Sequence, residues 1–222
     1  MLKCVMFDMD GTIADTHPLC LAAFQAALEK AGGREYTKAE ITATYGPSED
    51  GCLKTLVGDR AGEALVTYLE YYRAHHERLC PAPFPGITEI FDLVRSRGAA
   101  LALVTGKCAA SLALDLAAFG FEKRFQVIKT GHPEGAGKPA DMRAALWELG
   151  LRPEEAVYVG DAPEDVTSAR AAGLSVLAAA WAPGTERDQL RRLSPDRLCL
   201  TVADLAGYLE KTLGSALDND GR

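Results

Sequence analysis

Short, continuous apolar runs alternate with helical patterns over most of the chain. A continuous apolar run of a few residues is typical of a strand that is covered on both faces of a sheet. The predicted strands are residues 2–7, 99–105, 125–130, 156–160 and 174–179. The helical patterns that separate them are residues 87–97, 109–119, 141–149 and 163–172. Strands and helices in alternation predict an α/β fold with a parallel sheet and right-handed crossovers.

Residues 17–80 interrupt this alternation, because their apolar positions repeat with helical spacing only. The helical patterns in this part are residues 18–30, 38–44, 49–57 and 60–79. The Pro-rich stretch CPAPFPGI, at residues 80–87, ends them. We therefore predict two units, an α/β core formed by residues 1–16 and 82–222 and a helical insert formed by residues 17–81.

The composition of the 222-residue chain is ordinary for a globular protein, with 48% hydrophobic and 25% charged residues. No apolar run approaches the roughly 20 residues that cross a bilayer, and the start shows no secretion signal. The six cysteines form no CxxC pair, which favours reduced thiols and a cytoplasmic location. The net charge of −7 argues against nucleic-acid binding and is compatible with a monomer or a homodimer. The polar residues 215–222 are expected to be loose.

Charged and hydroxyl side chains gather where the predicted strands end. Asp8, Thr105 and Asp161 each close a predicted strand or follow it directly. Because the carboxyl ends of parallel strands meet at one edge of the sheet, we expect these residues to share one crevice. The full set expected there is Asp8, Asp10, Thr105, Lys138, Asp161 and Asp165.

Four carboxylates in one crevice raise one another's pKa or recruit a cation. Oxygen ligands without histidine or cysteine favour a hard ion, and Mg²⁺ first. Mg²⁺ usually keeps waters or substrate phosphate oxygens among its ligands, so the set indicates phosphoryl chemistry. Thr105, Lys138 and the backbone N–H of Gly106 would then hold the phosphate oxygens.

Four short motifs resemble those of the haloacid dehalogenase-like (HAD) phosphohydrolases, in the same order. They are DMDGT at residues 8–12, VTGK at 104–107, GKP at 137–139 and GDAPED at 160–165. The helical insert is similar to the C1 cap of that superfamily, and the resemblance runs from about residue 3 to 180. It implies a Rossmann-like hydrolase core with a helical cap, most similar to phosphoglycolate phosphatase-like and pyrophosphatase-like members.

The resemblance implies a role for each matching residue. Asp8 would attack phosphorus to give an aspartyl-phosphate, and Asp10 would protonate the leaving alcohol and then activate water. Mg²⁺ would be held by Asp8, Asp161 and the backbone carbonyl of Asp10, with Asp165 in support. Gly11 would permit the tight turn of the first motif. The implied activity is Mg²⁺-dependent hydrolysis of a small phosphorylated metabolite.

Three alternatives stay open. A phosphomutase of the β-phosphoglucomutase type would pass the phosphoryl group to a second hydroxyl, and an inorganic pyrophosphatase would release phosphate as the leaving group. A non-catalytic binding protein on the same fold is less favoured, because all four motifs retain their reactive residues. Asp10 argues against carbon–halogen hydrolysis, since the dehalogenases of the superfamily lack this second aspartate.

Some residues near the motifs have plainer interpretations. Many relatives carry Asn or Ser after the motif threonine, whereas this chain has Gly106 and then Lys107. We expect Lys107 to be a solvated lysine in the first turn of a helix, and the alternative is that it adds positive charge near the phosphate. Asp15 or Thr16 is expected to cap the helix that contains Pro18.

The loop TYGPSEDGC, at residues 44–52, lies between two predicted helices of the insert. In capped relatives a loop like this reaches over the active site. Glu49 and Asp50 make the loop acidic, which would disfavour very anionic substrate tails. His132, in the polar loop before Lys138, is interpreted as a loop residue without a role in the site.

Overall fold

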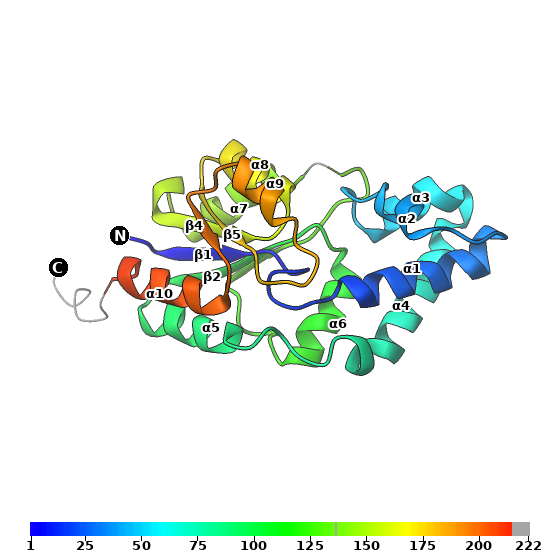
Figure 1. Cartoon of the computed structure of the whole chain (residues 1–222), viewed down its shortest axis with the longest axis horizontal. Helices are drawn as coiled ribbons and strands as arrows, with labels where there is room; N and C mark the ends of the chain where they lie inside the picture. The colour runs from blue at the N-terminus through cyan, green and yellow to red at the C-terminus, as the bar shows by residue number, and fades with distance from the viewer. Residues whose placement is uncertain (136, 215–222) are drawn as a thin grey trace.

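The computed structural model describes residues 1–135 and 137–214, so the prediction for residues 215–222 lies outside it. At its centre is a six-stranded parallel sheet in the order β3-β2-β1-β4-β5-β6 (Figure 1). The strands are β1 (Cys4–Phe7), β2 (Ala100–Val104), β3 (Val127–Lys129), β4 (Ala156–Gly160), β5 (Ser175–Ala179) and β6 (Arg197–Cys199). The first five are the strands that the apolar runs predict, and the predicted α/β fold with a parallel sheet is confirmed.

Helices cover both faces of the sheet, which explains why its strands are apolar throughout. Along β1, Val5 and Phe7 belong to one apolar cluster, and Cys4 and Met6 belong to another on the opposite face. The first cluster contains side chains of α5, α6 and α10, and the second contains side chains of α7, α8 and α9. These helices are α5 (Ile87–Ser96), α6 (Ala109–Phe119), α7 (Lys138–Leu149), α8 (Pro163–Ala172), α9 (Arg187–Arg192) and α10 (Val202–Thr212).

Four helices between β1 and α5 form the helical insert, which lies beside the sheet in Figure 1. They have an apolar cluster of their own, in which Phe24, Tyr68 and Tyr72 are buried. The last of the four also packs against α6, so the insert contacts the rest of the chain through that helix. The helices are α1 (His17–Gly32), α2 (Lys38–Thr42), α3 (Glu49–Val57) and α4 (Ala61–Leu79).

The segment after β5 contains elements that the apolar pattern does not predict. β6 has only three residues and begins with the exposed Arg197, so it presents no apolar run. α10 begins with a capping box, in which the Thr201 hydroxyl accepts from the Asp204 N–H and the Asp204 carboxylate accepts from the Thr201 N–H. The spacing of Thr201 and Asp204 in the sequence is a helix-start signal, and it could have indicated α10 where the apolar pattern did not. Within residues 1–135 and 137–214, no helix is both long and apolar enough to span a bilayer.

Candidate active site

The first motif forms the turn that follows β1. Asp8 is the first residue beyond the strand, and its backbone N–H donates to the carbonyl of Val159 on β4 at 2.9 Å. Gly11 has a φ of 71°, and a Cβ at this position would lie 2.2 Å from Oδ2 of Asp161. Glycine is therefore needed both for the turn and for the close approach of Asp161. Thr12 fixes that approach, because its hydroxyl donates to Oδ1 of Asp161 at 3.2 Å.

Three carboxylates from separate elements meet beside this turn. One oxygen atom from each of Asp8, Asp161 and Asp165 lies within 4.8 Å of the others, and all three residues are buried. Asp165 is held in the first turn of α8, where it accepts hydrogen bonds from the Ala162 N–H at 2.9 Å and the Tyr158 hydroxyl at 3.2 Å. This spacing and the oxygen-only ligand set fit a hard divalent cation such as Mg²⁺.

Lys138, the first residue of α7, points into the same cluster. Its Nζ lies 2.5 Å from Oδ1 of Asp165 and 3.3 Å from Oδ1 of Asp8. Burial disfavours the charged form of Lys138, but these carboxylates outweigh it and hold its pKa well above the usual value. Oδ1 of Asp8 has no hydrogen-bond partner among the described residues, and burial raises the pKa of Asp8 to about 7. The charge of Lys138 lowers the pKa of Asp8, but burial and the neighbouring carboxylates outweigh it, so a bound cation would add positive charge that this cluster needs.

A cavity of about 190 Å³ lies over these residues. Asp8, Thr105, Gly106 and Lys138 all line it, so the loops after β1 and β2 and the start of α7 contribute to one wall. Thr105 is buried directly after β2, and its hydroxyl accepts from the Lys107 N–H at 3.3 Å. Gly106 is exposed and precedes the start of α6 by three residues, so it lies in the loop before that helix rather than in its first turn.

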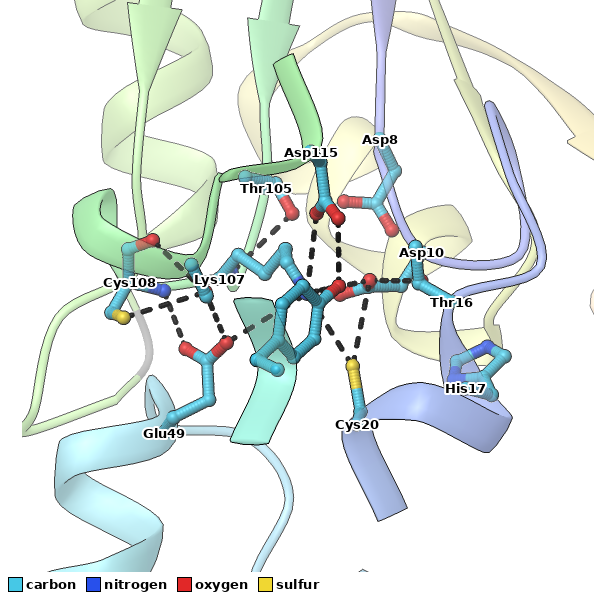
Figure 2. Close-up of polar contacts among 12 residues, drawn as sticks. Asp8, Asp10, Thr16, His17, Cys20, Glu49, Thr105, Lys107, Cys108 and Asp115 are labelled. Atoms are coloured by element: carbon cyan, nitrogen blue, oxygen red, sulfur yellow. Dashed lines mark hydrogen bonds and ion pairs between the residues drawn. The ribbon is translucent and has the colours of Figure 1, made fainter. Parts of the chain in front are cut away.

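The second carboxylate of the first motif, Asp10, has a different set of partners (Figure 2). Its Oδ1 lies 3.0 Å from Nζ of Lys107 and accepts the hydroxyl of Thr16. Burial disfavours ionisation of Asp10, but the charges of Lys107 and His17 and the bond from Thr16 outweigh it, so its pKa is lowered. Thr16 is the N-cap residue of α1, one of the two residues predicted for this position, but it makes no side-chain cap because its hydroxyl binds Asp10.

Lys107 is buried, and the prediction of a solvated lysine is wrong. Its side chain is 1% exposed. Figure 2 shows it among three carboxylates, with Nζ 3.0 Å from Asp10, 3.5 Å from Asp115 and 3.8 Å from Glu49. Burial disfavours the charged form, but these carboxylates hold the pKa of Lys107 well above its usual value. The prediction failed because Asp10 and Glu49 are distant from Lys107 in sequence, and Asp115, on the next helix, reaches Lys107 only through the way α6 packs.

Two of these carboxylates connect the helical insert to α6. Glu49, at the start of α3, accepts a hydrogen bond from the Cys108 N–H at 2.5 Å. Asp115, on α6, accepts from the Tyr72 hydroxyl at 2.7 Å and lies 2.9 Å from Nε2 of His76, and both of these residues are on α4. Glu49 is thus a buried hydrogen-bond acceptor between two elements, in addition to lining the cavity.

Two histidines also line the cavity. Nε2 of His17 lies 3.8 Å from Oδ2 of Asp161, and this contact raises the pKa of His17 to about 9. Nε2 of His132 lies 3.1 Å from Oδ2 of Asp141. The carbonyl of His132 accepts from the N–H of Ser48, just before α3, at 3.0 Å. His132 is therefore part of the cavity wall and of the contact with the insert, contrary to its interpretation from the sequence.

The fold and the site define a protein with a Rossmann-like parallel sheet and an acidic, cation-fitting centre at the carboxyl ends of its strands. The chain belongs to the haloacid dehalogenase-like hydrolase family, whose model matches residues 5–179. The resemblance drawn from the four motifs is thereby confirmed at the level of the family.

Individual relatives cover nearly the whole chain. Pyrophosphatase PpaX of Bacillus pumilus is 30% identical over 206 residues, which are 92% of this chain and 94% of that protein. A haloacid dehalogenase-like family hydrolase, SP0104 from Streptococcus pneumoniae, has a structure with a TM-score of 0.74 at 25% identity, covering 94% and 98% of the two chains. The structure of CbbY from Rhodobacter sphaeroides in complex with phosphate has a TM-score of 0.77 at 23% identity. The match covers 92% of this chain and 96% of that one, and it supports the fold.

Proposed function

We propose that this chain is a Mg²⁺-dependent phosphatase that hydrolyses a small phosphorylated metabolite through an aspartyl-phosphate on Asp8. The observation that carries the proposal is the environment of Asp8, a buried carboxylate that lines the cavity beside Lys138 and has an oxygen without a hydrogen-bond partner among the described residues. Such a carboxylate can act as a nucleophile when nearby positive charge keeps it ionised. In this proposal residues 17–81 form a cap over the core of residues 1–16 and 82–222.

The metal is proposed to be held by Asp8, Asp161 and the backbone carbonyl of Asp10, with Asp165 in support. The oxygen cluster and the under-compensated charge of Asp8 support this assignment. When bound, Mg²⁺ would offset negative charge on the phosphoryl oxygens and keep Asp8 ionised.

The phosphoryl oxygens are proposed to bind Thr105, Gly106 and Lys138. The hydroxyl of Thr105 and the N–H of Gly106 can donate hydrogen bonds, and Lys138 supplies a positive charge. All three residues line the cavity together with Asp8, which supports a shared ligand.

The reaction has two steps. In the first, an oxygen of Asp8 bonds to phosphorus, the bond from phosphorus to the leaving oxygen breaks, and Asp10 gives that oxygen a proton. In the second, water attacks phosphorus, Asp10 takes a proton from the water, and phosphate is released with both aspartates restored. The first step needs Asp10 protonated and leaves it as the carboxylate, which is the form that Lys107 and Thr16 stabilise and that the second step uses.

The substitution Asp8→Asn tests the covalent route, because it removes the nucleophile and keeps the size of the side chain. With Mg²⁺ and a panel of phosphate esters, we expect wild type to release phosphate and the variant to lose at least about a thousandfold in kcat. Asp92→Asn is the matched control, because Asp92 pairs with Arg124 on the surface and does not line the cavity. Release of phosphate by Asp8→Asn at the wild-type rate would overturn the proposal.

Inorganic pyrophosphate is a second candidate substrate, because relatives such as the Bacillus pumilus protein are named pyrophosphatase. The same two aspartates would serve, with phosphate as the leaving group. Incubation with a hexose 1-phosphate tests the phosphomutase alternative. A mutase would give an isomerised sugar phosphate, whereas a phosphatase gives free phosphate and sugar.

A further inference from the structure

The part of the cavity wall supplied by the helical insert is largely aromatic and apolar. Phe24 on α1, Tyr45 in the loop before α3 and Tyr68 on α4 line it. The ring centroid of Phe24 lies 4.9 Å from that of Tyr68 and 6.0 Å from that of Tyr45, so the three rings form one cluster. Cys20 and Cys52 line the same part of the cavity. Phe24 and Tyr68 are buried, whereas Tyr45 is 44% exposed.

The cavity offers little positive charge to a second anionic group on a ligand. Among the described residues that line it, none is an arginine, and each lysine or histidine already faces a carboxylate. These pairs are Lys138–Asp165 (2.5 Å), Lys107–Asp10 (3.0 Å), His132–Asp141 (3.1 Å) and His17–Asp161 (3.8 Å).

Among the described residues, the insert contributes one acidic side chain to the cavity wall. Glu49 lines the cavity, and its carboxylate accepts hydrogen bonds from the Cys108 N–H and the Ser111 hydroxyl. Asp10, held as a carboxylate by Lys107, lines the cavity as well. A carboxylate or phosphate placed beside this wall would lose water without gaining a free cation, whereas a flat or apolar group can pack on the aromatic wall.

We infer that the leaving group of the substrate is an uncharged alcohol with an aromatic or apolar body, bound against Tyr45, the exposed member of the cluster that Phe24 and Tyr68 complete. This inference rests on the proposed phosphatase function and narrows its substrate class. A leaving group that carries a carboxylate or a second phosphate finds no unpaired lysine, arginine or histidine among the described residues that line the cavity. The substrate class therefore differs from the one in the name of the pyrophosphatase relatives.

Primary alkyl phosphates that differ mainly in the group at the end of a short carbon chain test this inference with Mg²⁺ present. Benzyl phosphate carries a phenyl ring, phosphoglycolate a carboxylate and phosphoethanolamine an ammonium group. We expect kcat/KM for benzyl phosphate to exceed that for each of the other two, and for inorganic pyrophosphate, by at least about tenfold. An equal or higher value for any of these three compounds overturns the inference.

The same panel distinguishes the inference from the function on which it rests. If none of the four compounds releases phosphate in the presence of Mg²⁺, the phosphatase proposal fails and the inference fails with it. If phosphate is released and an anionic or cationic leaving group is preferred, the phosphatase proposal stands and only the inference fails.

Adding a cation to the aromatic wall sharpens the test. Tyr45→Lys is suited to this, because Tyr45 is partly exposed and its replacement leaves the buried rings in place. We expect the kcat/KM ratio of phosphoglycolate to benzyl phosphate to rise about tenfold. Val66→Lys is the matched control, because Val66 is 56% exposed on α4 and does not line the cavity, so the ratio should not change. Thermal unfolding shows whether both variants fold, and an unchanged ratio in folded Tyr45→Lys contradicts the assignment of this wall to the leaving group.

Discussion

Two lysines lie beside the candidate site, and they differ in the origin of their carboxylate partners: Lys107 is buried, and the side chain of Lys138 is 13% exposed. Lys138 contacts Asp8, just beyond β1, and Asp165, on α8. Lys107 contacts carboxylates of the same α/β unit but also Glu49, which begins α3 of the helical insert. The cluster around Lys138 is therefore fixed by the sheet and the helices next to it, whereas the cluster around Lys107 requires the insert to be in contact with α6.

This difference suggests separate purposes for the two clusters. Beside Lys138, Asp8 keeps an oxygen free of hydrogen bonds among the described residues, which leaves a position for a cation or a phosphoryl group. Around Lys107 the charges compensate one another within the protein, and Asp115 binds Tyr72 and His76 across the contact with the insert. We therefore expect substitution of Lys107 to appear mainly in stability and substitution of Lys138 mainly in rate.

The largest effect is expected for Lys107→Met. The variant leaves Asp115 and Glu49 buried without their cation, so the free energy of unfolding should fall by about 3–5 kcal/mol. Urea unfolding measures this loss. Lys123→Met is the control, because Lys123 is exposed, and it should change the free energy of unfolding by less than about 0.5 kcal/mol. A loss of less than about 1 kcal/mol in Lys107→Met would show that the buried cluster does not hold the insert in place.

The second-largest effect is expected for Lys138→Met, and it should appear in the rate of the reaction. Removal of a cation that offsets transition-state charge should lower kcat by about 10²–10³-fold on the best substrate of the ester panel. The control is again Lys123→Met, which should keep the wild-type kcat. If folded Lys107→Met lost as much kcat as Lys138→Met, both lysines would act on the reaction and the contrast between them would fail.

Mg²⁺ should distinguish the two clusters in the absence of any substrate. A ligand that binds only the folded state stabilises it by about 2.7 kcal/mol at a concentration one hundred times its Kd. We expect Asp161→Asn to abolish most of the rise in Tm that Mg²⁺ gives wild type, because Asp161 belongs to the oxygen cluster beside Asp8. Asp115→Asn, in the other cluster, should start from a lower Tm and keep the full rise. Equal rises in the two variants would place the cation elsewhere.

The strands could be predicted from the sequence because a strand that is buried on both faces consists of a continuous run of apolar residues. Residues 156–160 and 174–179 are examples, and β4 and β5 lie within these ranges. β6 could not be found in this way, because its three residues begin with the exposed Arg197 and form no apolar run, whereas the other edge strand, β3, lies within the apolar stretch of residues 125–130.

Part of the candidate site was predictable for a related reason. Asp8, Thr105 and Asp161 come together because parallel strands end at one edge of the sheet, and a strand end is visible in the sequence. The environment of Lys107 was not predictable, since its partners lie on elements whose contact depends on packing. One signal was present: Asp115 stands within the apolar run of residues 112–119, where an unpaired carboxylate would be costly. That signal predicts a buried partner without saying which one.

Lys3 is an exposed lysine with which Lys107 and Lys138 can be compared. Lys3 is 56% exposed and lies 2.8 Å from Glu155. Hydrogen bonds from Lys3 and Arg152 lower the pKa of Glu155 from 4.5 to about 2. Because the pKa is lower in the folded state, this carboxylate contributes stability above pH 4.5, and the contribution is lost as the pH falls from 4.5 towards 2.

The smallest effect is therefore expected for Glu155→Gln, and it should depend on pH and salt. The difference in free energy of unfolding between wild type and the variant should shrink as the pH falls through this window, and it should shrink in about 0.5 M salt, because exposed charges are screened. The loss in Lys107→Met should persist in the same salt, since buried charges are screened much less. If the loss of unfolding free energy in Lys107→Met also shrank in salt, water would reach the carboxylates around Lys107. The burial of Lys107 and the exposure of Lys3 would then not explain the difference between Lys107→Met and Glu155→Gln.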